Sequence, residues 1–181
     1  MRIYDYCHDY SDGIHLSLSM IAGQLVQTNG NIPMEPPMNA TLEKFGYPHT
    51  MLRDYEHWCV LLRPRQVTLG SLILAARSDA VALSELSQPA MSELSIISRD
   101  IESTLHANFR YSKLNYLMLM MVDPHVHFHV IPRYQSEREF MDLTFVDQDW
   151  PKPPDLNRSC IENIDKYNEL HCFLAKNWGR N

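Results

Sequence analysis

Three histidines alternate with apolar residues in the stretch HVHFHVIPR, which spans residues 125–133 of this 181-residue chain. Side chains two residues apart lie on the same face of a β-strand, with their Cα atoms roughly 7 Å apart. The spacing therefore predicts a strand that displays His125, His127 and His129 on one face and buries the intervening apolar side chains on the other. Since the whole chain has nine histidines, this alternation is improbable as a coincidence.

A row of imidazoles suits two kinds of chemistry. A neutral imidazole attacks phosphorus well, and neighbouring rings can orient it and donate hydrogen bonds to the phosphate oxygens. Histidines two apart on a strand can instead ligate zinc, but a tetrahedral metal usually recruits a ligand from another element, for which Asp142 is a candidate. The three histidines therefore predict either a phosphate-directed nucleophile or a metal site.

Short apolar runs on either side of a helical segment predict the sheet that positions the histidines. Residues 58–62 and 71–76 are two such runs, and they predict an antiparallel pair of strands joined across residues 63–70. Residues 115–121 predict a third buried strand, and the alternation at residues 125–131 predicts a fourth. Together these elements predict an α+β fold with a helix packed on one face of a sheet.

The segment between the second and third predicted strands has the pattern of an amphipathic helix. Ser87 is a candidate N-cap, and Pro89 lies in the first turn, where its missing N–H leaves no helical hydrogen bond unmade. The apolar stripe repeats at helical spacing and consists of Leu94, Ile97, Ile101 and Leu105. We therefore expect one main helix to pack against the sheet.

Composition divides the chain into three parts. Residues 1–40 end in a proline-rich stretch and predict a weakly structured N-terminal extension, and the shift in composition at Met38 raises the hypothesis that the native protein starts there. Residues 41–134 predict the domain that carries the histidines. Residues 135–181 predict a C-terminal tail with an amphipathic helix, whose stripe consists of Ile161, Ile164, Tyr167, His171, Leu174 and Trp178. On this stripe, His171 is expected to be a packed histidine rather than a ligand.

The overall composition excludes several classes of partner. The net charge is -6, and no cluster of Lys or Arg provides the basic face that a nucleic-acid binder needs. No apolar run approaches the length of a membrane span, and the acidic residues before the apolar stretch 15–26 do not fit a secretion signal. The four cysteines are scattered, which argues against disulfides and a cysteine zinc site. We therefore expect a cytoplasmic protein with no nucleic-acid or membrane partner.

The sequence HVHFHVIPRY resembles the signature of the histidine triad (HIT) family, in which three histidines alternate with apolar residues. Upstream, HWCVLLRPRQVTLGSLILAA resembles the family's paired strands, and the resemblance covers about residues 48–134. It implies a HIT-like half-barrel of the α+β class, with an antiparallel sheet, one main packing helix and a C-terminal helix. Members of the family are usually homodimers with a continuous sheet, so the resemblance also implies a homodimer.

The resemblance implies a hydrolase or nucleotidyl transferase that acts at the α-phosphate of a small nucleotide substrate, such as a diadenosine polyphosphate or phosphoramidate. His127 would be the nucleophile and would form a covalent phosphohistidine intermediate, while His125 and His129 would orient it and contact the phosphate. No cofactor and no protein-bound metal are implied, although magnesium can accompany the nucleotide. Two alternatives stay open: a nucleotide-binding module with little or no turnover, and a metal site built on the three histidines.

The chain departs from the family pattern at three places. Ser71 follows the turn glycine, where many members have a histidine, and Arg63 stands where they often have a small polar residue that contacts the ribose. Family enzymes commonly have a polar loop before the triad that touches the phosphate and the leaving group. Here no Gln, Ser or Thr occurs between Leu117 and His125, and Asp123 is expected to form a turn before a proline. These departures predict an unusual preference for the leaving group or a reduced turnover.

Overall fold

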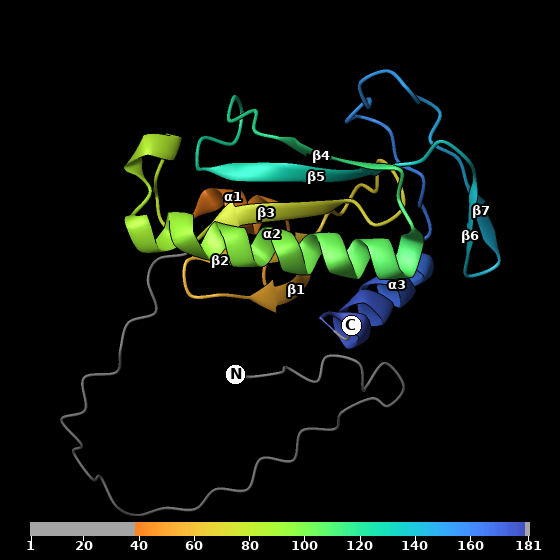
Figure 1. The fold of residues 1–181 in the computed structure, drawn as a ribbon, viewed down its shortest axis with the longest axis horizontal. Helices are drawn as coiled ribbons and strands as arrows, with labels where there is room; N and C mark the ends of the chain where they lie inside the picture. The colour runs from red at the N-terminus through yellow and green to blue at the C-terminus, as the bar shows by residue number, and fades with distance from the viewer. Residues whose placement is uncertain (1–38, 180–181) are drawn as a thin grey trace, which may run out of the picture. The chain divides into compact units, whose positions relative to one another are not determined.

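The computed structural model describes residues 39–179, which form an α+β fold around a five-stranded antiparallel sheet (Figure 1). The strands lie in the order β1-β2-β3-β5-β4, and β6 and β7 form a separate hairpin. The strands are β1 Met51–Asp54, β2 Trp58–Leu62, β3 Leu72–Ala76, β4 Lys113–Leu117, β5 His127–Arg133, β6 Arg138–Phe140 and β7 Leu143–Phe145. The helices are α1 Ala40–Lys44, η1 Leu83–Glu85, α2 Gln88–Phe109 and α3 Ile164–Asn177. The predicted fold class is therefore confirmed, with one main helix and a C-terminal helix.

Most of the expected N-terminal extension, including Met38, lies outside the described residues. Asn39 and Ala40 are the part of it that the structure describes, and they begin α1. None of the helices between residues 39 and 179 is both long enough and apolar enough to cross a membrane.

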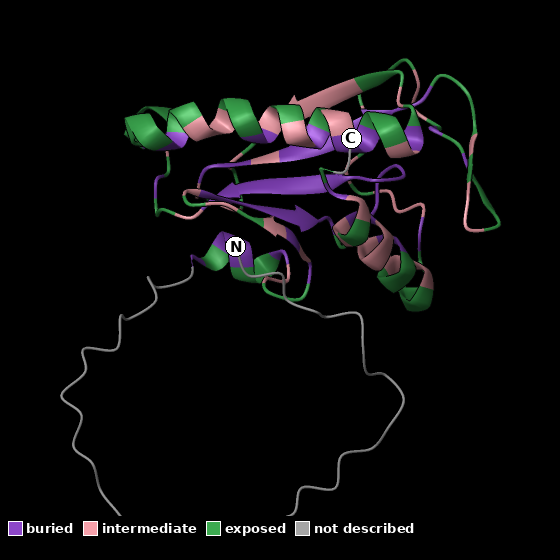
Figure 2. Ribbon diagram, turned by 60° about the horizontal axis from the view of Figure 1, so that its bottom comes forward, coloured by how far each residue is buried: buried purple, intermediate pink, exposed green. Residues whose placement is uncertain are grey.

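The sheet has a different covering on each face. The larger apolar cluster joins alternate side chains of the strands to α2 and α3, and it includes Trp58, Ile97 and Leu174. A smaller cluster on the opposite face joins Leu42 and Phe45, at α1, to other side chains of β2 and β3. Figure 2 shows the buried strands between the long helix α2 above and α1 below. His127 and His129 lie opposite Ala75 and Ile73 of this smaller cluster, so α1 covers the face that carries these two histidines.

The main helix follows its sequence pattern closely. Ser87 accepts a hydrogen bond from Ala90 N and caps α2, as predicted. The stripe residues Ile97, Ile101 and Leu105 are fully buried, because they face the sheet. The helix ends at Arg110, whose positive φ of 49° gives the left-handed conformation that commonly ends helices.

Two of the four predicted strands have other bounds than expected. β4 covers Lys113–Leu117 rather than residues 115–121: its pairing with β5 ends at Leu117, opposite His129, and Met120, with a φ of +43°, is not extended. The side chain of Met121 is 87% exposed, so the apolar composition of this run wrongly predicted its burial. β5 begins at His127, so the prediction of one strand carrying all three histidines was also wrong.

The C-terminal helix packs as expected over most of its stripe. Leu174 and Trp178 are buried, and His171 Nε2 donates to Met51 O at 3.0 Å, so His171 is a packed histidine. Burial lowers the pKa of His171, and that hydrogen bond opposes the shift. Ile164 was wrongly placed on the buried stripe: it is the first residue of α3 and is 66% exposed.

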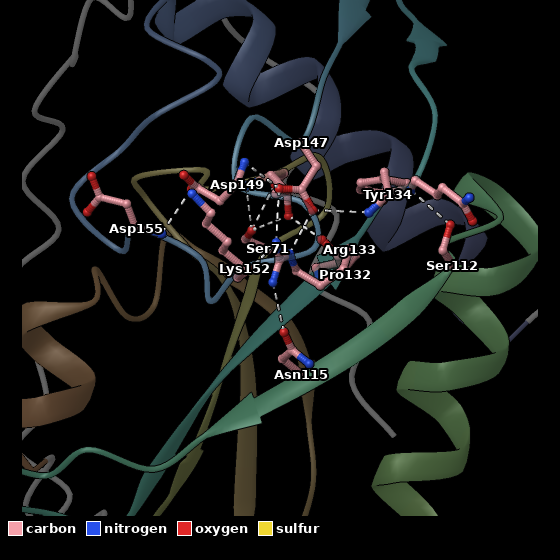
Figure 3. Close-up of polar contacts among 12 residues, drawn as sticks. Ser71, Ser112, Asn115, Pro132, Arg133, Tyr134, Asp147, Asp149, Lys152 and Asp155 are labelled. Carbon is pink, nitrogen blue, oxygen red and sulfur yellow. Dashed lines mark hydrogen bonds and ion pairs between the residues drawn. The ribbon is translucent and has the colours of Figure 1, made fainter.

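A buried ion pair fixes the C-terminal segment to the end of β5 (Figure 3). Arg133 Nε and Nη2 donate to the two carboxylate oxygens of Asp147 at 2.7 and 3.2 Å, and the side chains are 4% and 1% exposed. Tyr134 N also donates to Asp147, and Arg133 donates further to Asn115 Oδ1 and Lys152 O. The strand that carries the histidines is therefore anchored at one end by a fully paired charge.

Candidate functional site

Two of the three histidines lie side by side on β5. His127 is opposite Ala75 of β3, and His129 is opposite Ile73, so both side chains lie on the same face of the sheet. Their ring centroids are 5.0 Å apart, with an angle of 77° between the ring planes. Phe128 points to the other face and packs against the larger apolar cluster. The alternation that the sequence predicted thus holds for His127 and His129.

Helix α1 brings further residues onto these two histidines. The ring of Phe45 lies 5.6 Å from that of His127 and 5.7 Å from that of His129. Asn39 caps α1 through a hydrogen bond from Leu42 N, and its side-chain nitrogen donates to Ala76 O at 2.9 Å. The cap therefore also ties the helix to the end of β3, which places Phe45 over the histidine pair.

His127 has one ring nitrogen fixed and one without a partner. Its Nδ1 lies 2.8 Å from His125 O, and because a carbonyl oxygen only accepts, Nδ1 must carry the proton. In the neutral ring, Nε2 then holds a free lone pair. Among the described residues Nε2 has no hydrogen-bond partner; it also has no exposed surface, and the residue is 1% exposed. The hydrogen bond to His125 O therefore selects the tautomer in which Nε2 can act as the nucleophile.

His129 is held in its neutral form. The residue is 7% exposed, and its Nδ1 is buried without a partner. Burial, followed by the nearby His127, Arg63 and Lys44, lowers the pKa of His129 to about 4, and Asp123 opposes the shift. A neutral ring can donate one hydrogen bond to a phosphate oxygen, and a bound anion would favour its protonation.

This pKa shift predicts a loss of stability in acid that depends on His129. The unfolded chain takes up a proton near pH 6.5 and the folded chain only near pH 4. The stabilisation is therefore complete above pH 6.5 and is lost as the pH falls toward 4, by at most about 3 kcal/mol. Urea unfolding at pH 7 and pH 4.5 measures it. We expect the His129→Gln variant to lose less stability over this interval than the wild type, and an equal loss would contradict the shift.

His125 lies just before β5 and connects the histidine segment to α1. Its Nδ1 lies 3.0 Å from Thr41 Oγ1, and its Nε2 lies 3.9 Å from Asp79 Oδ1. A second link joins the same two segments: Lys44 Nζ pairs with Asp123 Oδ1 at 2.6 Å. The apolar loop before the triad and α1 are thus held together across the histidines. Sequence reasoning missed Thr41, Lys44 and Phe45, because only the three-dimensional fold brings α1 to β5.

Ser71, where many HIT proteins have a histidine, belongs to a turn rather than to the histidine pair. Its hydroxyl donates to Thr68 O at 2.8 Å, and Gln66 Oε1 accepts from Ser71 N at 3.0 Å. Ser71 is fully buried. These bonds shape the connection between β2 and β3, so the site has no fourth imidazole from this position.

The metal hypothesis finds no cluster in the part of the chain that the structure describes. Within residues 39–179, no three His, Cys, Asp or Glu side chains are grouped so that they could hold a metal ion. His125 bonds to α1, while His127 and His129 face Phe45. Asp142, the candidate fourth ligand, has a positive φ of 58° in the turn between β6 and β7.

Comparison with known proteins agrees with the motif. Residues 49–136 match the family model of the HIT domain. A comparison with curated protein sequences finds no significant match.

Solved structures of histidine triad proteins share the fold at low sequence identity. A protein from Bradyrhizobium japonicum is 18% identical, with 78% of this chain and 96% of that chain covered and a TM-score of 0.60. A protein from Sinorhizobium meliloti is also 18% identical, with 77% and 95% covered and a TM-score of 0.61. A hypothetical histidine triad nucleotide-binding protein from Sulfolobus tokodaii is 14% identical, with 71% and 82% covered and a TM-score of 0.52.

Proposed function

We propose that this protein is a nucleotide hydrolase or nucleotidyl transferase that acts at an α-phosphate through a covalent intermediate on His127. The HIT domain supports nucleotide binding, or hydrolase or transferase activity, at the level of the family. One observation carries the finer proposal: His127 Nδ1 donates to His125 O at 2.8 Å, which leaves the Nε2 lone pair free and without a partner. A diadenosine polyphosphate, a phosphoramidate or a similar nucleotide conjugate is the expected substrate.

The proposed reaction has two steps. In the first, His127 Nε2 forms a bond to the α-phosphorus as the bond from phosphorus to the leaving group breaks. The carbonyl of His125 accepts from Nδ1 and stabilises the positive charge that develops on the ring. In the second step, water or another acceptor attacks phosphorus, and the N–P bond breaks to regenerate the imidazole. His129 and His125 are proposed to contact the phosphate oxygens and orient the nucleophile.

A second candidate function is a nucleotide-binding module with little turnover. It is favoured by the loop before the triad, which has no Gln, Ser or Thr to assist the leaving group, and whose Asp123 is paired with Lys44 at 2.6 Å. This alternative predicts stabilisation by nucleotides without turnover. The metal alternative has less support, because the described residues offer no cluster for an ion.

A substrate panel separates the two candidates. Diadenosine polyphosphates, nucleoside phosphoramidates and nucleotide sugars are assayed with and without magnesium, and thermal unfolding is followed with the same compounds. The proposed enzyme releases a nucleoside monophosphate from at least one of them. Stabilisation by nucleotides without release from any compound would favour the binding module.

A cytoplasmic location stays a prediction.

We also expect a homodimer whose sheet continues across β4. Among the strands that the structure describes, β4 is at the edge of the sheet and pairs with β5 alone, so we expect the other side of its backbone to pair with a second copy. Light scattering after size exclusion should give about twice the 21.1 kDa mass of the chain. A monomer mass at micromolar concentration would contradict the expectation.

A further inference from the structure

A buried arginine lies on the same side of the sheet as the histidines. Arg63 N donates to Ser71 O at 3.0 Å, so the ladder between β2 and β3 continues one residue beyond β2. Cys59 and Leu61 belong to the cluster beneath α1, and alternation along the strand places Arg63 on that face as well. Arg63 therefore occupies the next side-chain row on the face that carries the histidine pair.

The guanidinium of Arg63 is buried without a negatively charged partner. The residue is 8% exposed, and its terminal nitrogens donate to two backbone carbonyls, Arg65 O and, at 2.9 Å, Leu156 O. Its Nε has neither a partner nor exposed surface. Burial, followed by the nearby Arg65, lowers the pKa of Arg63 to about 10, so the side chain still carries its charge at pH 7. Two neutral acceptors leave that charge uncompensated.

The other buried arginine on β5 provides a comparison. Arg133 is paired through two hydrogen bonds with Asp147, which neutralises its charge. Burying a cation is costly unless an anion pairs with it. Across residues 39–179, no carboxylate forms an ion pair with Arg63. An anionic group of a ligand would supply the missing partner.

The charge of Arg63 already acts on the histidine pair. After burial and His127, Arg63 is the next cause that lowers the pKa of His129. Lys44 also contributes, but its charge is matched by Asp123 at 2.6 Å. The unpaired positive charge beside the histidines is therefore that of Arg63.

We infer that Arg63 binds a second phosphate of the substrate, carried by the ribose of the nucleotide. The inference rests on the proposed function, because it takes the first phosphate to lie at His127. Arg63 is two strands and two side-chain rows from His127, which separates their Cα atoms by about 16 Å. A nucleotide phosphorylated at the 2′ or 3′ position carries two phosphates separated by its ribose, so it can present one phosphate to each of these side chains.

Binding measurements test the inference without relying on turnover. Each common nucleoside 5′-monophosphate is titrated against its 2′- and 3′-phosphorylated counterparts by calorimetry. For at least one base, we expect the bisphosphate to bind about tenfold more tightly or better, as for a hydrogen-bonded charge pair. The Arg63→Gln variant should lose that preference and bind the monophosphate within about threefold of the wild type. Arg65→Gln is the matched control: it removes an exposed charge from the same turn and should keep the preference.

Additional variants and ligands show whether Arg63 contacts the second phosphate directly or changes the affinity through the structure or the overall charge. Arg63→Lys retains the charge but not both carbonyl bonds, so it should keep part of the preference; behaviour identical to Arg63→Gln would overturn the inference. Equal affinities within every wild-type pair, or an equal loss in Arg65→Gln, would also overturn it. If ATP binds more tightly than AMP by the same factor as the bisphosphates do, the assignment of the second phosphate to the ribose is wrong. If the wild type prefers the bisphosphates but turns over no substrate, the proposed catalysis is wrong. The role of Arg63 in binding then still holds.

Discussion

We expect the His127→Ala variant to lose catalytic turnover by about a thousandfold or more while it stays folded. The imidazole of His127 supplies the lone pair that forms the bond to phosphorus, and the alanine side chain has no group that could replace it. The loss should appear in kcat, since the covalent step itself is removed. Steady-state kinetics on whichever panel compound is turned over, with thermal unfolding of the same samples, measures both quantities.

A matched variant controls for the loss of a histidine as such. His106 is an exposed histidine on α2, which covers the opposite face of the sheet. His106→Ala should keep kcat and KM within about twofold. If His127→Ala retained turnover on every active compound, the nucleophilic role of His127 would be wrong, whatever the effect on binding.

The largest expected effect on stability comes from Asp147. The Asp147→Asn variant removes the negative charge that pairs with Arg133 and leaves a buried cation without compensation. Breaking a buried pair in this way costs about 3 to 5 kcal/mol in the free energy of unfolding. The backbone donor Tyr134 N also loses its carboxylate acceptor. Urea unfolding of the variant and the wild type at pH 7 measures the difference.

The control for this prediction is an ion pair at the surface. Lys166 and Glu169 are 3.0 Å apart on α3, with half-exposed side chains. Glu169→Gln should change stability by less than about 1 kcal/mol, because exposed pairs contribute little. If Asp147→Asn were equally mild, the buried pair would not anchor the C-terminal segment as we describe.

Local periodicity predicted the elements that pack independently of distant partners. β2 and β3 match the apolar runs, and α2 begins after the predicted cap, because caps and alternating burial are encoded by neighbouring residues. The same alternation predicted that His127 and His129 share a face. Composition alone was insufficient at residues 118–121, which are apolar but pair with no strand of the described part of the chain.

The surroundings of the histidines could not be predicted in the same way. Thr41 and His125 are 84 residues apart in sequence, and their hydrogen bond exists only because α1 folds onto the sheet. Lys44 and Asp123 meet for the same reason. Arg63 was recognised as a departure from the family pattern, but its lack of a charged partner depends on burial, which no local pattern reports.

The most direct test of the central claim is to trap the intermediate. Wild-type protein is mixed with a substrate from the panel, quenched in alkali within one turnover, digested and analysed by mass spectrometry, since phosphohistidine survives alkali better than acid. Our account predicts a nucleotidyl group on His127 that forms and decays at the rate of turnover. Turnover without an adduct, or an adduct that forms on His125 or His129 instead, would contradict it.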